Sequence, residues 1–213
     1  DALMCLLNKA IRDGGTCYCA LYELNDPELI EKILEAKNNV RLILSNTGPD
    51  DKTNEVARES LHDAGMDITD RMVSSGHIGH NKFVVYVNKK GQATTVLTGS
   101  TNWTYSGLCS QSNNAILIES TELASHYLDY WKRMKTDDAA QGKGFRSKND
   151  KKRTAKIGST KISLWFSPNT KAQNKTAGSP MPNDVKQVFD AMNKAKKSIL
   201  FLAFQPGTPS IID

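Results

Sequence analysis

The chain has 213 residues, of which 38% are hydrophobic and 24% are charged. This length allows one α/β domain or one domain and part of another, and the composition is typical of a globular protein. No apolar run approaches the roughly 20 residues that span a bilayer, so no transmembrane segment is predicted. The first residue is Asp1 and not methionine, which favours a processed or excised piece of a longer protein.

The net charge of +5 arises from one polar stretch. Residues 143–161 contain eight basic side chains against one acidic side chain, a balance of +7 that leaves −2 for the rest of the chain. Charge runs of this kind are typical of solvated linkers. The remainder is slightly acidic, which argues against a broad basic surface for nucleic acid.

The first 65 residues alternate between helical and extended patterns. Apolar residues at helical spacing and runs of strand formers predict a helix at 3–11, a strand at 16–24, a helix beginning at Pro27, a strand at 40–44 and a helix at 53–64. Asp26 precedes Pro27 and is expected to cap the second helix. This alternation predicts an α/β fold with a parallel sheet and covering helices.

The centre of the chain has a different pattern. The predicted elements are a strand at 82–87, a turn at 88–91, a strand at 93–98, a strand at 115–118 and an amphipathic helix at 121–135. The first two strands therefore form a hairpin. Residues 136–160 show no periodicity, and we interpret them as a basic linker or mobile loop.

The end of the chain resembles its beginning at an offset of 182 residues. Val185 and Val188 correspond to Leu3 and Leu6, and Pro209 corresponds to Pro27. The order of helix, strand and proline-started helix returns, which predicts a duplicated domain. We therefore expect a first repeat at 1–135, the linker at 136–160 and the beginning of a second repeat at 161–213.

Two polar motifs flank the predicted hairpin. His80 and Lys82 enter its first strand on the same face, because strand side chains alternate. The second strand ends in Gly99-Ser100-Thr101-Asn102, in which Ser100 and Asn102 offer neutral donors. An imidazole can act as nucleophile or general acid, and an ammonium stabilises phosphoryl oxygens. The hairpin brings these groups together, so the sequence predicts an anion site.

These motifs resemble those of the phospholipase D superfamily, often called the HKD family. The resemblance rests on His80-x-Lys82 and on residues 99–104; it covers residues 3–135 and resumes over 161–213. It implies an α/β/α sandwich with a mixed, mostly parallel sheet, repeated twice around a shared cleft. It also implies a phosphohistidine intermediate without metal or other cofactor. His80 would serve as one motif histidine, Lys82 and Asn102 would bind phosphate oxygens, and Ser100 would support them.

Two positions depart from the family pattern. Val87 stands where the family has an aspartate, and residues 112–114 offer only amides and a hydroxyl where an acid often orients a motif histidine. A second histidine-lysine motif is expected near position 262, so this chain is expected to hold a half-site completed by a second repeat or a second chain.

Three interpretations of function remain open at this point. The first is a phosphodiesterase acting on a phospholipid, and the second is a nuclease of the same superfamily acting on DNA or RNA. The third is a non-catalytic scaffold or binding module with a degenerate site. His77 and His80 are three residues apart, but without a third ligand they do not indicate a zinc site.

Overall fold

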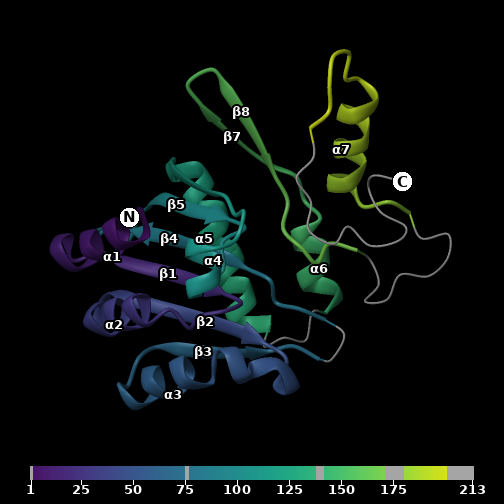
Figure 1. Cartoon of the computed structure of the whole chain (residues 1–213). Helices are drawn as coiled ribbons and strands as arrows, with labels where there is room; N and C mark the ends of the chain where they lie inside the picture. The colour runs from purple at the N-terminus through teal and green to yellow at the C-terminus, as the bar shows by residue number, and fades with distance from the viewer. Residues whose placement is uncertain (1, 75–76, 138–141, 171–179, 201–213) are drawn as a thin grey trace. The chain divides into compact units, whose positions relative to one another are not determined.

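A computed structural model describes residues 2–74, 77–137, 142–170 and 180–200 (Figure 1). The chain divides into two compact units, residues 1–173 and residues 174–213. The first unit contains the main sheet and its covering helices. The second contributes helix α7 (Asn183–Asn193), which the repeat pattern predicted.

A six-stranded mixed sheet, in the order β3-β2-β1-β4-β5-β6, forms the centre of the first unit. Its strands are β1 (Thr16–Leu21), β2 (Val40–Asn46), β3 (Ile68–Met72), β4 (Lys82–Val87), β5 (Ala93–Gly99) and β6 (Ala115–Glu119). β2 pairs in parallel with both β1 and β3, and the other three pairings are antiparallel. The predicted mixed sheet is confirmed. Parallel pairings are not the majority, because a short turn such as that between β4 and β5 can join only antiparallel strands.

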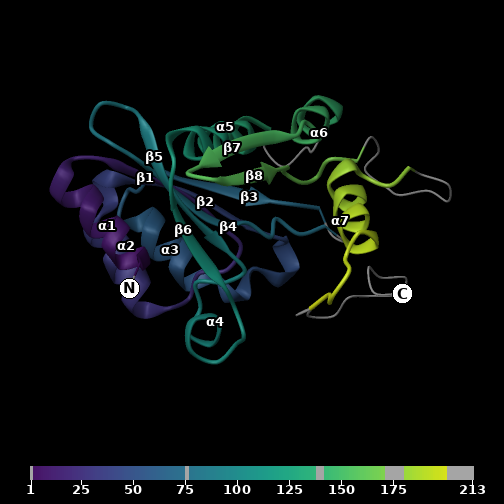
Figure 2. The same ribbon diagram turned by 90° about the horizontal axis from the view of Figure 1, so that it is seen from above.

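Helices cover both faces of this sheet, which confirms the α/β/α arrangement (Figure 2). The helices of the first unit are α1 (Ala2–Asp13), α2 (Pro27–Glu35), α3 (Glu55–Asp63), α4 (Tyr105–Cys109), α5 (Thr121–Asp137) and α6 (Lys143–Asn149), with short 3₁₀ turns η1 (Lys37–Asn39) and η2 (Gly48–Thr53). The apolar faces of α1, α2 and α3 share one core with the sheet, and α5 and α6 share the other.

Local sequence signals account for several of these elements. Asp26 caps α2 as predicted, because its Oδ1 accepts a hydrogen bond from the backbone N–H of Leu29 at 3.0 Å. Along β4, Val84 packs into the core beneath α1 to α3, whereas Phe83 and Val85 pack beneath α5. This alternation follows the two-residue period of a strand and places Lys82 on the same face as Val84.

The linker expected at 136–160 contains regular structure instead. α6 is followed by a hairpin of β7 (Arg153–Ile157) and β8 (Thr160–Leu164). Phe145 is buried in α6, and Phe166 stacks on Tyr130 of α5 with ring centroids 4.1 Å apart. A few aromatic anchors therefore hold this polar segment to the first unit, and they are too sparse to produce a hydrophobic period.

The sequence analysis missed one strand, and two of its predictions fall largely or wholly outside the described residues. β3 was not predicted. The strand expected at 199–205 falls largely, and the helix expected from Pro209 falls entirely, outside the described residues. Among the described helices, none combines the length and apolar character needed to cross a membrane.

Candidate functional site

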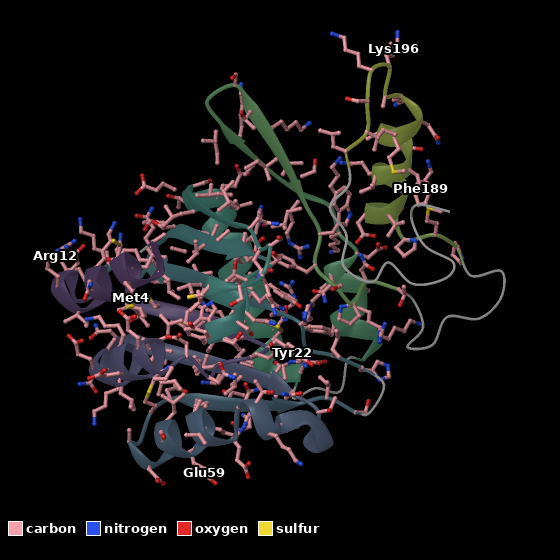
Figure 3. The ribbon with its side chains drawn as sticks, viewed as in Figure 1. Met4, Arg12, Tyr22, Glu59, Phe189 and Lys196 are labelled. Carbon is pink, nitrogen blue, oxygen red and sulfur yellow. The ribbon has the colours of Figure 1, made fainter. Side chains whose placement is uncertain are left out.

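The two polar motifs meet at one edge of the sheet. Lys82, at the start of β4, lies opposite Leu21, at the end of β1, and Phe83 lies opposite Thr98 near the end of β5. The segments that carry His80 and Asn102 therefore adjoin the same strand ends. Figure 3 shows Tyr22, the residue after β1, at this edge, and Arg12 at the opposite end of the sheet.

Tyr22 forms an aromatic wall beside both basic residues. Its ring centroid lies 4.8 Å from that of His80, with an angle of 66° between the rings. The Nζ atom of Lys82 lies 5.3 Å from the Tyr22 ring centroid, which is within the range of a cation–π contact. Tyr22 thus contacts both the imidazole of His80 and the ammonium of Lys82.

Lys82 is a buried cation at this edge of the sheet. Its side chain belongs to a residue only 8% exposed, and its Nζ donates to the backbone oxygen of His80 at 3.5 Å. Among the described residues, no carboxylate lies within salt-bridge distance of this Nζ. Burial lowers the pKa of Lys82 to about 8, although the nearby charge of Glu23 acts in the opposite direction. Such a group favours binding of an anion.

His80 is exposed at the surface, but its ring is partly desolvated. This desolvation, together with the charge of Lys82, lowers the pKa of His80 below its ordinary value. The lowered pKa favours the neutral form of the imidazole. A neutral ring nitrogen has a lone pair available for attack on an electrophile.

Asn102 is connected to this edge through Glu23. The Nδ2 of Asn102 donates to Glu23 Oε2 at 2.5 Å, and the backbone N–H of Trp103 donates to the Glu23 carbonyl at 3.1 Å. Fully buried Asn54 fixes the same segment, because its side chain bonds the Tyr22 carbonyl and the Leu24 N–H, each at 2.9 Å. The Oδ1 of Asn102 is buried and has no hydrogen-bond partner among the described residues.

Ser100 stabilises the loop that follows β5. Its hydroxyl donates to Asn113 Oδ1 at 3.1 Å and accepts from the Asn114 N–H at 3.0 Å. Gly99 permits the close approach of this loop, since a Cβ there would lie 2.1 Å from the Asn114 carbonyl oxygen. The structure thus joins His80 and Lys82 through Tyr22 and places Asn102 against Glu23. Ser100 has a supporting position, and the catalytic roles of all four residues remain predictions.

The sequence analysis assigned no function to Tyr22 or Glu23. Both follow β1, and the available signal was a polar pair at the end of an apolar strand. Their relevance depends on β1 lying next to β4, which the order of elements along the chain did not reveal. Within the described residues, no group of three or more His, Cys, Asp or Glu side chains is placed to hold a metal ion.

The buried charge of Lys82 has a measurable consequence for stability. We expect Lys82→Met to raise the free energy of unfolding at pH 7 by up to about 3 kcal/mol, since the pKa falls from 10.5 to about 8 on folding. Between pH 8 and 10.5 the unfolded chain retains the proton that the folded chain has lost, so this contribution makes wild-type stability rise with pH. The gain from Lys82→Met should therefore shrink over that interval. Urea unfolding at pH 7 and pH 10 measures the difference in unfolding free energy between Lys82→Met and wild type. The exposed residue Lys89, replaced in Lys89→Met, provides the control. An equal gain in stability at both pH values would contradict the burial cost.

Comparison with protein families gives one match over most of the first unit. The family model described as "Cardiolipin synthase, PLD-like domain" matches residues 3–135. A phospholipase D of Rickettsia felis is 28% identical over 129 residues, which cover 59% of this chain and 60% of the relative. A phospholipase D of Rickettsia prowazekii is 30% identical over 126 residues, covering 58% and 57%. The chain thus spans about 60% of the length of these curated relatives.

Solved structures resemble the same region. Nuc of Salmonella typhimurium, a phospholipase D family member, has a TM-score of 0.49 at 24% identity, covering 62% of this chain and 85% of that protein. A polyphosphate kinase of Porphyromonas gingivalis has a TM-score of 0.50 at 15% identity, covering 65% and 24%. At this identity, the likeness to the kinase concerns the fold.

Proposed function

Because the chain belongs to the family of phospholipase D-like domains, we propose that it supplies half of a phosphodiesterase site that cleaves a phospholipid through a phosphohistidine. The observation that carries this proposal is the buried ammonium of Lys82, which lacks a carboxylate partner among the described residues and lies beside a neutral histidine. A phosphodiester offers the negative oxygen that this ammonium requires.

In the proposed reaction His80 is the nucleophile. A ring nitrogen of His80 forms a bond to phosphorus while the bond from phosphorus to the leaving alcohol oxygen breaks. A second histidine, from the other half of the site, gives its proton to that oxygen. Water or an alcohol then attacks the phosphohistidine, the histidine–phosphorus bond breaks, and the second histidine takes the proton of the attacking molecule. Lys82 and Asn102 stabilise the phosphoryl oxygens throughout.

The departure at Val87 does not weaken this proposal. Val87 is buried in the core beneath α5, at the far end of β4 from Lys82. Five strand residues span about 17 Å, so the side chain at position 87 is remote from the phosphate site. At the other departure, Asn113 binds Ser100 and the Gly107 carbonyl, and Glu23 supplies a carboxylate at the same edge of the sheet. These contacts favour an enzyme over a degenerate scaffold.

A second phospholipase D-like unit is proposed to bring the second histidine. Large apolar side chains are exposed beside the site on edge strand β6 and on α4: Ile116 (54% exposed), Leu117 (39%), Leu108 (44%) and Tyr105 (67%). An exposed apolar strand at a sheet edge is a liability that proteins normally cover. A second repeat, in this protein or in another chain, is the occupant that the reaction requires.

A substrate panel tests the proposal in an assembly that contains both motif histidines. We expect release of the head-group alcohol from phospholipid micelles, and formation of a new phosphatidyl ester when ethanol replaces water as the acceptor. Trapping by ethanol is the signature of a phosphoenzyme that partitions between two acceptors. Cleavage of single-stranded DNA or RNA without cleavage of lipid would support the nuclease alternative. Binding without cleavage of any phosphodiester would support the scaffold.

A further inference from the structure

A carboxylate lies among the groups of the proposed phosphate site. It belongs to Glu23, which follows β1 and is half-buried. Its Oε2 accepts the 2.5 Å hydrogen bond from Asn102 Nδ2, and its charge acts on the ammonium of Lys82. The neighbouring residue Tyr22 contacts the same ammonium through its ring. An anion that binds to both Lys82 and Asn102 therefore lies close to a negative charge.

The backbone on both sides of Glu23 is fixed. The side chain of fully buried Asn54 bonds the Tyr22 carbonyl and the Leu24 N–H, each at 2.9 Å. The carbonyl of Glu23 itself accepts a hydrogen bond from the backbone N–H of Trp103 at 3.1 Å. Because its side chain is also hydrogen-bonded, the carboxylate is a built part of this edge of the sheet and not a surface group that turns toward solvent.

Phosphate esters differ in charge according to the number of their ester bonds. A phosphodiester carries one negative charge at pH 7, whereas a phosphomonoester carries about −1.5 to −2, because its second pKa is near 6. Each added negative charge is attracted by Lys82 and repelled by Glu23, and partial burial strengthens both forces. The carboxylate therefore offsets the advantage that a buried ammonium gives to the more highly charged ligand.

We propose that Glu23 is a specificity-determining residue, which disfavours dianionic phosphomonoesters and leaves the site open to monoanionic phosphodiesters. This role rests on the proposed function, in which Lys82 and Asn102 bind the phosphoryl oxygens. The same repulsion acts on the product. Attack of water on the phosphohistidine gives a phosphomonoester, which becomes a dianion when it loses its second proton. Repulsion by Glu23 then favours release of the product over release of the substrate.

A purely orienting role for Glu23 has a different consequence. The variant Glu23→Gln keeps a side-chain oxygen that can accept the hydrogen bond from Asn102, but it removes the negative charge. If Glu23 only orients the amide, the variant should retain the preference of wild type among anions. If the charge of Glu23 selects the ligand, that preference should change.

The proposed selection acts at the phosphate position itself. His80 also lines a cavity of about 450 Å³, but neither Lys82 nor Glu23 is among the described residues that line this cavity. Anions that lack a head group therefore test the selection. Methyl phosphate is mainly a dianion at pH 7, methyl sulfate is a monoanion, and both present three terminal oxygens. These two ligands differ in charge at nearly the same shape, and dimethyl phosphate represents the diester.

Titration of each anion into the isotope-labelled 213-residue chain at pH 7 and low salt measures the affinities, through the amide signals of residues 80–82 and of Asn102. Wild type should bind methyl phosphate no more tightly than methyl sulfate, although methyl phosphate carries the larger charge. Glu23→Gln should shift the ratio of the two dissociation constants toward methyl phosphate by roughly 10-fold, the effect of about one further unit of charge at a partly hydrated site.

Glu59→Gln is the matched control, because it also removes one negative charge. Glu59 is exposed on α3 and lies away from Tyr22 in Figure 3. This variant should keep the ratio of dissociation constants that wild type shows.

Tighter binding of methyl phosphate than of methyl sulfate by wild type would overturn the selection, and this comparison needs no variant. An unchanged ratio in Glu23→Gln, or an equal shift in Glu59→Gln, would overturn the role of Glu23. A different pattern, in which none of the three anions binds or Lys82→Met leaves their binding unchanged, would contradict the proposed function, and the selection would fall with it.

Discussion

Replacement of His80 with alanine is expected to lower phosphodiester turnover by at least about 10³-fold in an assembly that contains both motif histidines, as loss of a covalent nucleophile does in other enzymes. Alanine leaves Lys82 and Asn102 to bind the phosphate but offers no atom that can form a bond to phosphorus. We therefore expect the loss in kcat and little change in the affinity for an inert phosphate ester. Steady-state hydrolysis of bis(p-nitrophenyl) phosphate measures the first quantity, and calorimetry measures the second.

His126→Ala is the control for this experiment. His126 is half-buried on α5 and is not among the residues that line the cavity beside His80. It should retain wild-type turnover. The proposed reaction also predicts that wild-type turnover persists in excess chelator, because each bond change is assigned to a histidine. Full activity in His80→Ala, or complete loss in chelator that a divalent ion restores, would rule out this mechanism.

The sequence predicted much of the fold because local signals coincide with the tertiary structure. Asp26 before Pro27 marks the start of α2, and the turn at 88–91 marks the β4–β5 hairpin. β3 was missed because its buried residue is Arg71, so no apolar alternation marks the strand. α6 was missed because Phe145 and Arg146 are buried within a strongly basic run that is typical of a solvated linker.

The candidate site was predicted in part. His80 and Lys82 follow from the motif and from strand alternation, whose consequences are local. Tyr22 and Glu23 become relevant only because β1 lies beside β4. Contacts of this kind depend on which elements become neighbours, and a single sequence does not specify the neighbours of each strand.

A proven monomer of the 213-residue chain is expected to show essentially no turnover. The phosphohistidine reaction needs a nucleophile and a separate proton donor, and His80 cannot perform both roles in one step. The chain contains four histidines, and none follows His126. His62 is hydrogen-bonded to Asp70 at 2.8 Å on the outer side of α3, and His126 lies on α5. Activity should therefore require a second unit.

Of the other three histidines, His77 is the one that could invalidate the argument. It lines the same cavity as His80, and its Nδ1 lies 3.2 Å from Ser74 Oγ. If His77 served as the proton donor, one chain would hold both histidines. The variant His77→Ala tests this possibility. If a monomer is active and His77 is its proton donor, the variant should lose that activity.

Hydrolysis of bis(p-nitrophenyl) phosphate, measured together with the mass in solution by sedimentation, decides the matter. If two copies form the site about a two-fold axis, each site needs two His80 side chains, so activity should follow the square of the wild-type fraction. Equal amounts of wild type and His80→Ala that exchange freely should then retain about a quarter of the activity of the same total amount of wild type.

The segment 161–213 is expected to occupy that interface and to prevent this pairing, so we expect the chain alone to be monomeric and inactive. Robust turnover by a sedimenting monomer would refute the half-site, and its loss in His77→Ala would identify His77 as the second histidine.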